Sequence, residues 1–117
     1  MNNLKDLNCT PLSSESVRLG DAEIKEYLID IPLWHLIEKE GIQRLERTYQ
    51  FKNFTDALAF TSHVGETAEM QDHHPSILTE WGKVTINWWT HKVKGLHLND
   101  FIMAARSDKI YTSQGQP

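Results

Sequence analysis

The chain has 117 residues, a length that suits one domain rather than two. Hydrophobic residues make up 39% of it and charged residues 24%, which is ordinary for a folded globular domain. The formal net charge is -4, so the chain lacks the excess of Lys and Arg that binding to nucleic-acid phosphates requires. A direct partnership with DNA or RNA is therefore not expected.

A single cysteine, Cys9, excludes an intramolecular disulfide and a cysteine-rich zinc site. It lies in a polar stretch without a neighbouring histidine, and we interpret it as an incidental thiol. The first residues lack the apolar core of a signal peptide, and no apolar run approaches the roughly 20 residues that span a bilayer. These features predict a cytoplasmic protein without a membrane partner.

The chain begins with a polar stretch. Residues 1–19 show no periodicity, which predicts a flexible N-terminal arm. After it, Asp21 is placed to cap a helix that Pro32 ends, because the residue before a proline is displaced from α geometry. The apolar residues of this helix recur at helical spacing: Ile24, Tyr27, Leu28 and Ile31.

Alternating apolar residues predict four strands arranged in two hairpins. The first hairpin joins residues 34–38 to residues 42–51, and the second joins residues 77–81 to residues 83–91. The turn residues of these hairpins are Glu40, Gly41 and Gly82. Because the turns are short, the strands of each pair must be antiparallel.

A long helix is predicted between the two hairpins. Asn53 offers an N-cap, and Pro75 requires the helix to finish near His74. Gly95 breaks the chain after the second hairpin, and a last helix is predicted over residues 98–110. We expect one apolar stripe along the long helix: Phe54, Ala57, Leu58, Thr61, Val64, Gly65 and Ala68.

The predicted element order is α-β-β-α-β-β-α. It indicates an α+β fold in residues 20–111, a four-stranded antiparallel sheet with three helices on one face. Residues 112–117 are predicted to form a disordered tail. The sheet leaves two free edges, and Trp89 points away from the helical layer, where a ligand or another subunit must cover it. A homo-oligomer is therefore expected.

Candidate chemistry is concentrated at the end of the long helix. Glu69 and His73 are four residues apart, which places both side chains on one helix face. A neighbouring carboxylate and the negative end of the helix dipole both favour a protonated imidazole. His73 and His74 therefore occupy positions that suit a general acid near neutral pH.

Structural roles alone can also explain these residues. Histidines in the last turn of a helix are ordinary capping residues, and Glu69 with His73 can form a surface ion pair of little energy. A zinc site from His73, His74 and His91 is geometrically conceivable, but the usual ligand spacing is missing around the adjacent pair. The remaining histidines are interpreted as surface or capping residues: His35, His63 and His97.

The order and spacing of these residues resemble the signature of the pterin-4a-carbinolamine dehydratases. The matching positions are Glu69-x-x-x-His73-His74-Pro75, Trp81, Thr90-His91, Gly95-Leu96 and Asp100. The run Phe51-Lys52-Asn53-Phe54 resembles the helix entry of that family, and Trp34 falls where the family has a tryptophan opening its first strand. The resemblance covers residues 18–105, nearly the whole predicted domain.

The resemblance implies a four-stranded antiparallel sheet with three helices that assembles as a homodimer or homotetramer. It also implies an activity: removal of water from 4a-hydroxytetrahydropterin to give quinonoid dihydropterin, in the recycling of pterins used by aromatic amino acid hydroxylases. No metal and no organic cofactor is implied. The expected small-molecule partner is the pterin substrate.

The resemblance further implies roles for single residues. His73, His74 and His91 match the three active-site histidines of the family. His73 and His91 are the candidate general acids and bases, and His74 is expected to position the substrate. Glu69 is expected to support His73, and Trp34 to form a wall for the pterin ring.

The sequence departs from the family pattern at two places. His97 stands where the family usually has a Ser or Thr N-cap, which leaves the start of the last helix open. Trp88-Trp89 replaces a smaller pair before His91, so the shape of the site beside His91 is expected to differ. Asp100 is expected to stabilise the N-terminus of the last helix rather than to contact substrate.

Two other functions stay open at this point. Animal relatives also serve as a dimerisation cofactor for a homeodomain transcription factor, so the chain can be a non-catalytic pterin-binding or protein-interaction module. A relative that acts in another pterin pathway, such as molybdopterin metabolism, would keep the same histidines. The presence of all three histidines, His73, His74 and His91, favours catalysis.

Overall fold

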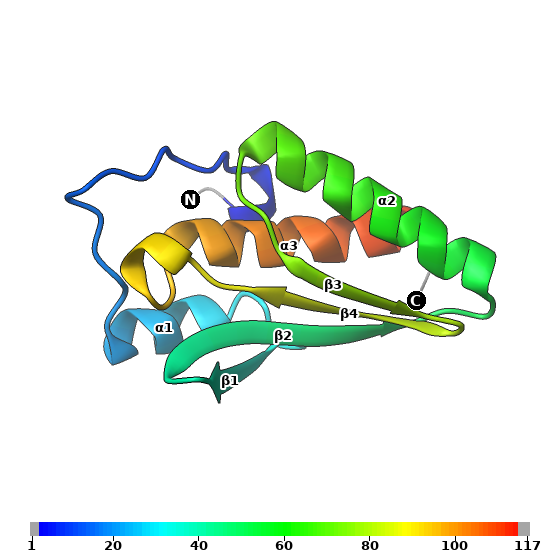
Figure 1. Ribbon diagram of the computed structural model, residues 1–117, viewed down its shortest axis with the longest axis horizontal. Helices are drawn as coiled ribbons and strands as arrows, with labels where there is room; N and C mark the ends of the chain where they lie inside the picture. The colour runs from blue at the N-terminus through cyan, green and yellow to red at the C-terminus, as the bar shows by residue number, and fades with distance from the viewer. Residues whose placement is uncertain (1–2, 115–117) are drawn as a thin grey trace.

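The structure is a computed structural model that describes residues 3–114. Within this range the chain forms a four-stranded antiparallel sheet and three α-helices in the order α-β-β-α-β-β-α (Figure 1). The predicted fold class is therefore confirmed. Two short 3-10 helices, η1 (Leu4–Asp6) and η2 (His91–Val93), accompany these elements. No helix among the described residues is long and apolar enough to cross a membrane.

The sheet is built from the two predicted hairpins. Strand β1 (His35–Lys39) pairs with β2 (Ile42–Gln50), and β3 (Ser76–Glu80) pairs with β4 (Lys83–Trp88). Strands β2 and β4 then join the hairpins, which gives the order β1-β2-β4-β3. The edges of the sheet are therefore β1 and β3, and β4 is held in register from both sides.

The turn between β1 and β2 shows why the first hairpin is tight. Lys39 pairs with Ile42, so only Glu40 and Gly41 lie between the strands. Both have positive φ angles, 55° and 78°. Two-residue turns of this kind match the right-handed twist of the strands, and glycine adopts the required backbone angles without strain.

Helices α2 (Phe54–Gln71) and α3 (Leu98–Ser113) lie across the same face of the sheet (Figure 1). Helix α1 (Asp21–Leu28) joins this layer through Tyr27, whose ring lies 5.4 Å from that of Phe101 in α3. The buried residues of β2 and β4 alternate as the sequence predicts and face these helices: Leu45, Tyr49, Val84, Ile86 and Trp88. The core therefore lies between the sheet and the helix pair.

The predicted apolar stripe of α2 is partly wrong. Phe54 and Leu58 are 44% and 48% exposed. Helix α2 carries two apolar lines at helical spacing, and the sheet covers only one of them. That line consists of Ala57, Phe60, Val64 and Ala68.

The ends of the other helices also differ from expectation. Gly20, not Asp21, is the N-cap of α1, and its N–H donates to the Glu23 carboxylate at 3.3 Å. Helix α3 continues to Ser113, so residues 112 and 113 of the predicted tail are helical. Residues 115–117 lie outside the described residues. At the other end, residues 3–10 of the segment predicted as a flexible arm lie against α3.

The second half of α3 is tied to the sheet through Asp108. One oxygen of its carboxylate accepts hydrogen bonds from the Trp34 indole at 3.0 Å, from Arg47 at 2.6 Å and from the Tyr49 hydroxyl at 2.5 Å. Burial raises the pKa of Tyr49 far above its ordinary value, and the negative charge of Asp108 adds to this effect. The Tyr49 hydroxyl therefore remains a neutral donor at all physiological pH values.

Replacing Asp108 by alanine is expected to lower the free energy of unfolding by about 2 to 4 kcal/mol, because buried donors on Trp34, Arg47 and Tyr49 lose their common acceptor. Equilibrium urea unfolding at a fixed protein concentration measures the change. Lys109→Ala is the matched control, because this neighbouring side chain is exposed and should contribute little. Equal stability of the two variants would contradict the role given to Asp108.

Candidate active site

His73 is placed by the way α2 ends. Asp72 adopts the left-handed conformation with φ 53°, its N–H donates to the Glu69 carbonyl at 3.2 Å, and the His73 N–H donates to the Ala68 carbonyl at 3.1 Å. These two bonds form a Schellman motif, which fixes the direction in which the chain leaves a helix. The helix therefore ends at Gln71, earlier than predicted, and His73 stands just beyond it in a defined position.

This helix end gives His73 a partner that the sequence did not predict. Its Nε2 lies 2.6 Å from an oxygen of Asp100, and the two side chains are 7% and 0% exposed. Glu69, the predicted partner, instead lies 2.8 Å from Nε2 of His74. The expectation was wrong because the left-handed Asp72 turns His73 away from the helix face that carries Glu69.

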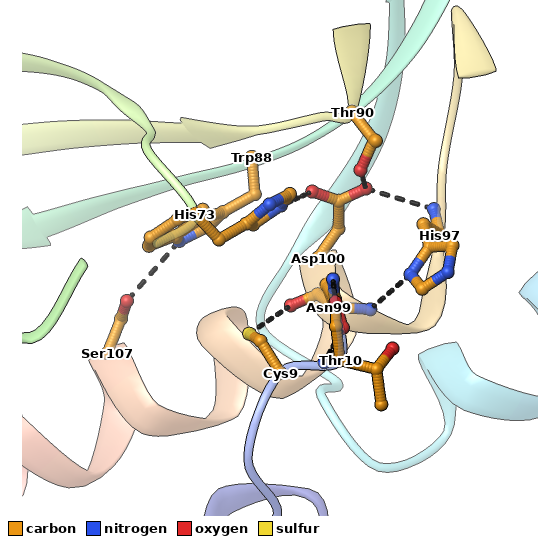
Figure 2. Close-up of polar contacts among 9 residues, drawn as sticks. All are labelled: Cys9, Thr10, His73, Trp88, Thr90, His97, Asn99, Asp100 and Ser107. Carbon is orange, nitrogen blue, oxygen red and sulfur yellow. Dashed lines mark hydrogen bonds and ion pairs between the residues drawn. The ribbon is translucent and has the colours of Figure 1, made fainter. Parts of the chain in front are cut away.

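Asp100 is the centre of the site. Its second oxygen accepts hydrogen bonds from the Thr90 hydroxyl at 2.7 Å and from the backbone N–H of His97 at 3.0 Å (Figure 2). The bond from His97 is one half of a capping box at the start of α3, as expected for Asp100. The bonds from His73 and Thr90 were missed, because they join residues 27 and 10 positions apart in the chain.

The arrangement around Asp100 selects one tautomer of His73. An ionised carboxylate only accepts hydrogen bonds, so the proton shared at 2.6 Å belongs to His73 Nε2. No hydrogen bond joins the other ring nitrogen, Nδ1, to another group within residues 3–114, so this nitrogen is free for a ligand. A buried carboxylate orients catalytic histidines in this way in other enzymes.

The plane of the His73 ring is fixed as well. It stacks on the Trp88 ring with centroids 5.7 Å apart and an angle of 6° between the planes. Trp88 is fully buried, and its indole N–H donates to the Ser107 hydroxyl at 3.3 Å (Figure 2). Helix α3 therefore holds His73 twice, directly through Asp100 and indirectly through Trp88.

His74 and Glu69 form an exposed pair beside this centre. Their side chains are 58% and 79% exposed, so their mutual contact contributes little to stability. Their polar groups remain open to a ligand. Glu69 therefore pairs with His74 and not, as the sequence had predicted, with His73.

His91 is the third predicted histidine, and it is exposed in η2 rather than at the end of a strand, because β4 stops at Trp88. Its ring lies edge-on to Trp89, with centroids 5.1 Å apart. The guanidinium of Arg44 covers Trp89 at 4.0 Å from the ring centroid. Neither Nε of Arg44 nor the indole nitrogen of Trp89 has a hydrogen-bond partner within the described residues.

Trp34 lies apart from the histidines. It is 5% exposed, and its indole contacts Asp108. Asp108 stands eight residues, or about 12 Å of helix, from Asp100. The ring of Trp34 therefore offers little open surface to a ligand in this chain.

A surface hollow of about 480 Å³ opens beside the second half of α3 rather than beside His73. Its walls include Leu4, Asp30, Asp108 and Thr112. Within residues 3–114, no group of three or more His, Cys, Asp or Glu side chains is arranged to hold a metal ion. His73, His74 and His91 are not gathered into such a group.

Comparison with known proteins decides the family. Residues 17–110 match the family model described as pterin 4 alpha carbinolamine dehydratase. The chain belongs to this family. The family match includes every residue of the sites described around Asp100, His74 and His91.

Individual relatives agree with this assignment. A protein of Microcystis aeruginosa, provisionally named pterin-4-alpha-carbinolamine dehydratase, is 54% identical over 97% of this chain and 98% of its own length. A protein of Marinobacter nauticus with the same provisional name is 50% identical over 95% of this chain and all of its own length. A crystal structure from Brucella melitensis, described as a transcriptional coactivator/pterin dehydratase, superimposes with a TM-score of 0.73 at 29% identity, covering 80% of this chain and 97% of that one.

The departure from the family pattern at His97 has a structural explanation. His97 is the N-cap of α3, and its Nδ1 accepts a hydrogen bond from the Asn99 N–H at 3.0 Å. Burial lowers the pKa of His97, an effect that the Asp100 carboxylate opposes and His73 reinforces. The lowered pKa keeps the imidazole neutral, as an accepting cap must be. Histidine thus replaces Ser or Thr as a cap that depends on pH.

Because the folded-state pKa of His97 is lowered, the unfolded chain binds its proton more readily. Its contribution to stability is present above the unfolded pKa near 6.5 and is lost as the pH falls through the lower folded value. His97→Ser retains a cap without a titrating group. The variant should therefore lose less stability than the wild type between pH 7.5 and pH 5, as measured by urea unfolding.

His63→Ser is the matched control, because it makes the same substitution at an exposed histidine of α2 that caps no helix. A pH dependence of unfolding that is identical in the His97 variant and the wild type would show that His97 does not act as a titrating cap.

Proposed function

We propose that the chain dehydrates 4a-hydroxytetrahydropterin to quinonoid dihydropterin and water. The family assignment supports the pterin substrate. The observation that carries the reaction type is the carboxylate of Asp100, which holds His73 on one oxygen and Thr90, the residue before His91, on the other. One buried group thereby contacts His73 directly and fixes the residue that precedes His91.

The chemistry requires two proton transfers. The C4a–O bond breaks, and the leaving oxygen receives a proton so that it departs as water. The N5 lone pair forms the new N5=C4a double bond, and the N5 proton passes to a base. Histidines perform both transfers efficiently near neutral pH, and no other reactant is needed.

His73 and His91 are assigned as the general acid and general base, with the order set by the stereochemistry of the substrate. His73 exchanges its proton at Nδ1, the nitrogen that Asp100 leaves open. Exposed His74, paired with Glu69, positions the pterin. The two acid–base histidines are thus held differently, one buried and stacked, the other exposed beside Trp89.

Replacing His73 or His91 by alanine is expected to slow turnover of 4a-hydroxytetrahydropterin by about 10²- to 10⁴-fold, the usual effect of losing a general acid or base. His74→Ala should raise KM at least as much as it lowers kcat, because His74 positions substrate. A stopped-flow dehydration assay measures these constants, and circular dichroism checks that each variant is folded.

His35→Ala and His63→Ala are the controls, because both histidines are exposed and far along the chain from Asp100. Asp100→Asn tests the role of Asp100 apart from that of His73. This variant should lower kcat although His73 is still present, because the amide no longer fixes which nitrogen of His73 carries the proton. Near wild-type rates in both His73→Ala and His91→Ala would refute the catalytic assignment.

We also infer that the protein is a homodimer or homotetramer. Large apolar side chains that a monomer would leave in water lie on the last turn of α2, on edge strand β3 and in the turn after β3. They are Met70 at 83%, Leu78 at 57% and Trp81 at 69% exposed. Light scattering at micromolar concentration should therefore give a multiple of 13.6 kDa. A stable mass of one chain would contradict this inference.

A second candidate function comes from the Brucella melitensis structure, whose description includes transcriptional coactivator. A protein-interaction role would not require the histidines to transfer protons. A scaffold needs a folded surface, but it does not need His73 in a proton-transfer site. A wild-type protein that binds pterin but shows no dehydration above the uncatalysed rate would favour this alternative.

A further inference from the structure

The segment before the family match makes specific contacts near the candidate site. Residues 3–10, here called the N-terminal strap, precede residue 17, where the family match begins. Two consecutive peptide groups of the strap reach two different helices. The N–H of Cys9 donates to the Gln71 side chain at 2.7 Å, and the N–H of Thr10 donates to the Asn99 side chain at 3.0 Å.

Both contacted residues lie within two positions of the site in the sequence. Gln71 is the last residue of α2, two positions before His73. Asn99 immediately precedes Asp100 in the first turn of α3, and it is 2% exposed. The strap therefore links the two helix ends from which the His73–Asp100 pair extends, as Figure 2 shows for Cys9, Thr10 and Asn99.

The link is reinforced at several points. The Asn99 amide returns a hydrogen bond to the Thr10 carbonyl at 2.9 Å, so these residues are joined in both directions. The Arg106 guanidinium, two turns further along α3, donates to the Leu7 carbonyl at 3.0 and 2.7 Å and to Asn8 at 2.9 Å. The buried side chain of Leu4 anchors the start of the strap.

The strap lies outside residues 17–110, the part of the chain that the family model matches. The Brucella melitensis chain matches 80% of this chain while using 97% of its own length. The Microcystis and Marinobacter relatives, in contrast, cover 97% and 95% of this chain. The strap buries Leu4 in the core and also contacts two helix ends beside the site, so its contacts do more than bury apolar surface.

We propose that the N-terminal strap is a positioning element that fixes the end of α2 against the start of α3 and thereby sets the His73–Asp100 geometry. The part of this role that concerns turnover rests on the proposed function. A hydrogen-bonded pair at 2.6 Å between a helix end and a helix start is sensitive to small relative shifts of the two helices. Such misplacements of about 1 Å can cost on the order of 10²-fold in rate.

The chain carries its own reporter of strap docking. Cys9 is the only cysteine, it is partly buried, and its Sγ lies 3.9 Å from the Asn99 carbonyl. Burial raises the pKa of the Cys9 thiol to about 11, against a lowering influence of Arg106. The thiolate that reacts with alkylating reagents is therefore scarce while the strap is docked and becomes available when it is released.

Two variants release the strap without changing the site. Arg106→Gln removes the anchor to Leu7 and Asn8, and Thr10→Pro removes the N–H that binds Asn99. Both should raise the rate of Cys9 alkylation about tenfold or more in the full-length protein. Lys25→Gln, an exposed cation on α1, is the control and should leave the rate unchanged.

The site is then measured in two independent ways. The downfield NMR resonance of the His73 Nε2 proton, which reports the bond to Asp100 directly, should shift or broaden in both variants and not in the control. In the dehydration assay, kcat should fall about tenfold to a hundredfold with a smaller change in KM, while circular dichroism stays native.

Released Cys9 with an unchanged His73 resonance would overturn the proposal, because the strap would then be attached without positioning the pair. Unchanged alkylation in both variants would overturn it as well, since these contacts would not hold the strap. An altered His73 resonance in variants of a protein whose wild type shows no dehydration would support the strap and refute the proposed function instead.

Discussion

A carboxylate that is removed from water needs hydrogen-bond donors for both of its oxygens. Asp100 is fully buried, and the structure of the candidate site depends on how this need is met. Its donors come from three places: the second residue after the end of α2, the residue after Trp89 beyond β4, and the cap of α3. Moving any of these segments would leave an oxygen of this buried carboxyl group with fewer hydrogen bonds. Three segments of the candidate site are therefore held together by one side chain.

Helix α3 contains two carboxylates that each accept three hydrogen bonds from other parts of the chain or from the helix cap. Asp108 gathers three donors from the first half of the sheet, and Asp100 gathers three from the segments that carry the candidate chemistry. The two clusters differ in what they leave open. Around Asp108 the ring of Tyr49 and the indole of Trp34 are buried, whereas around Asp100 the ring of His73 retains an unused nitrogen. The Asp108 cluster contains no histidine, whereas the Asp100 cluster leaves one histidine nitrogen available to a ligand.

The local part of this architecture was predictable from sequence. Alternation and short turns specified both hairpins, and Asn53 was recognised as the cap of α2, where it accepts from Asp56 at 2.7 Å. The partner of His73 was not predictable. Asp72 adopts a left-handed conformation that redirects the chain, and the spacing of apolar residues does not reveal a single residue with positive φ. Asp100 was recognised as a helix-end residue, but its bond to His73 depends on how two distant elements pack.

Consecutive residues of an extended chain point to opposite faces, and Trp89 directly follows Trp88, the last residue of β4. Trp88 faces the core and stacks on His73, while Trp89 faces outward and contacts His91. A slip of β4 by one residue would exchange the two rings and deprive both histidines of their aromatic support at once. The pairing of β4 with both β2 and β3 therefore determines where the two histidines stand, so mutations that loosen strand register far from the histidines would disturb the candidate site before they unfold the domain.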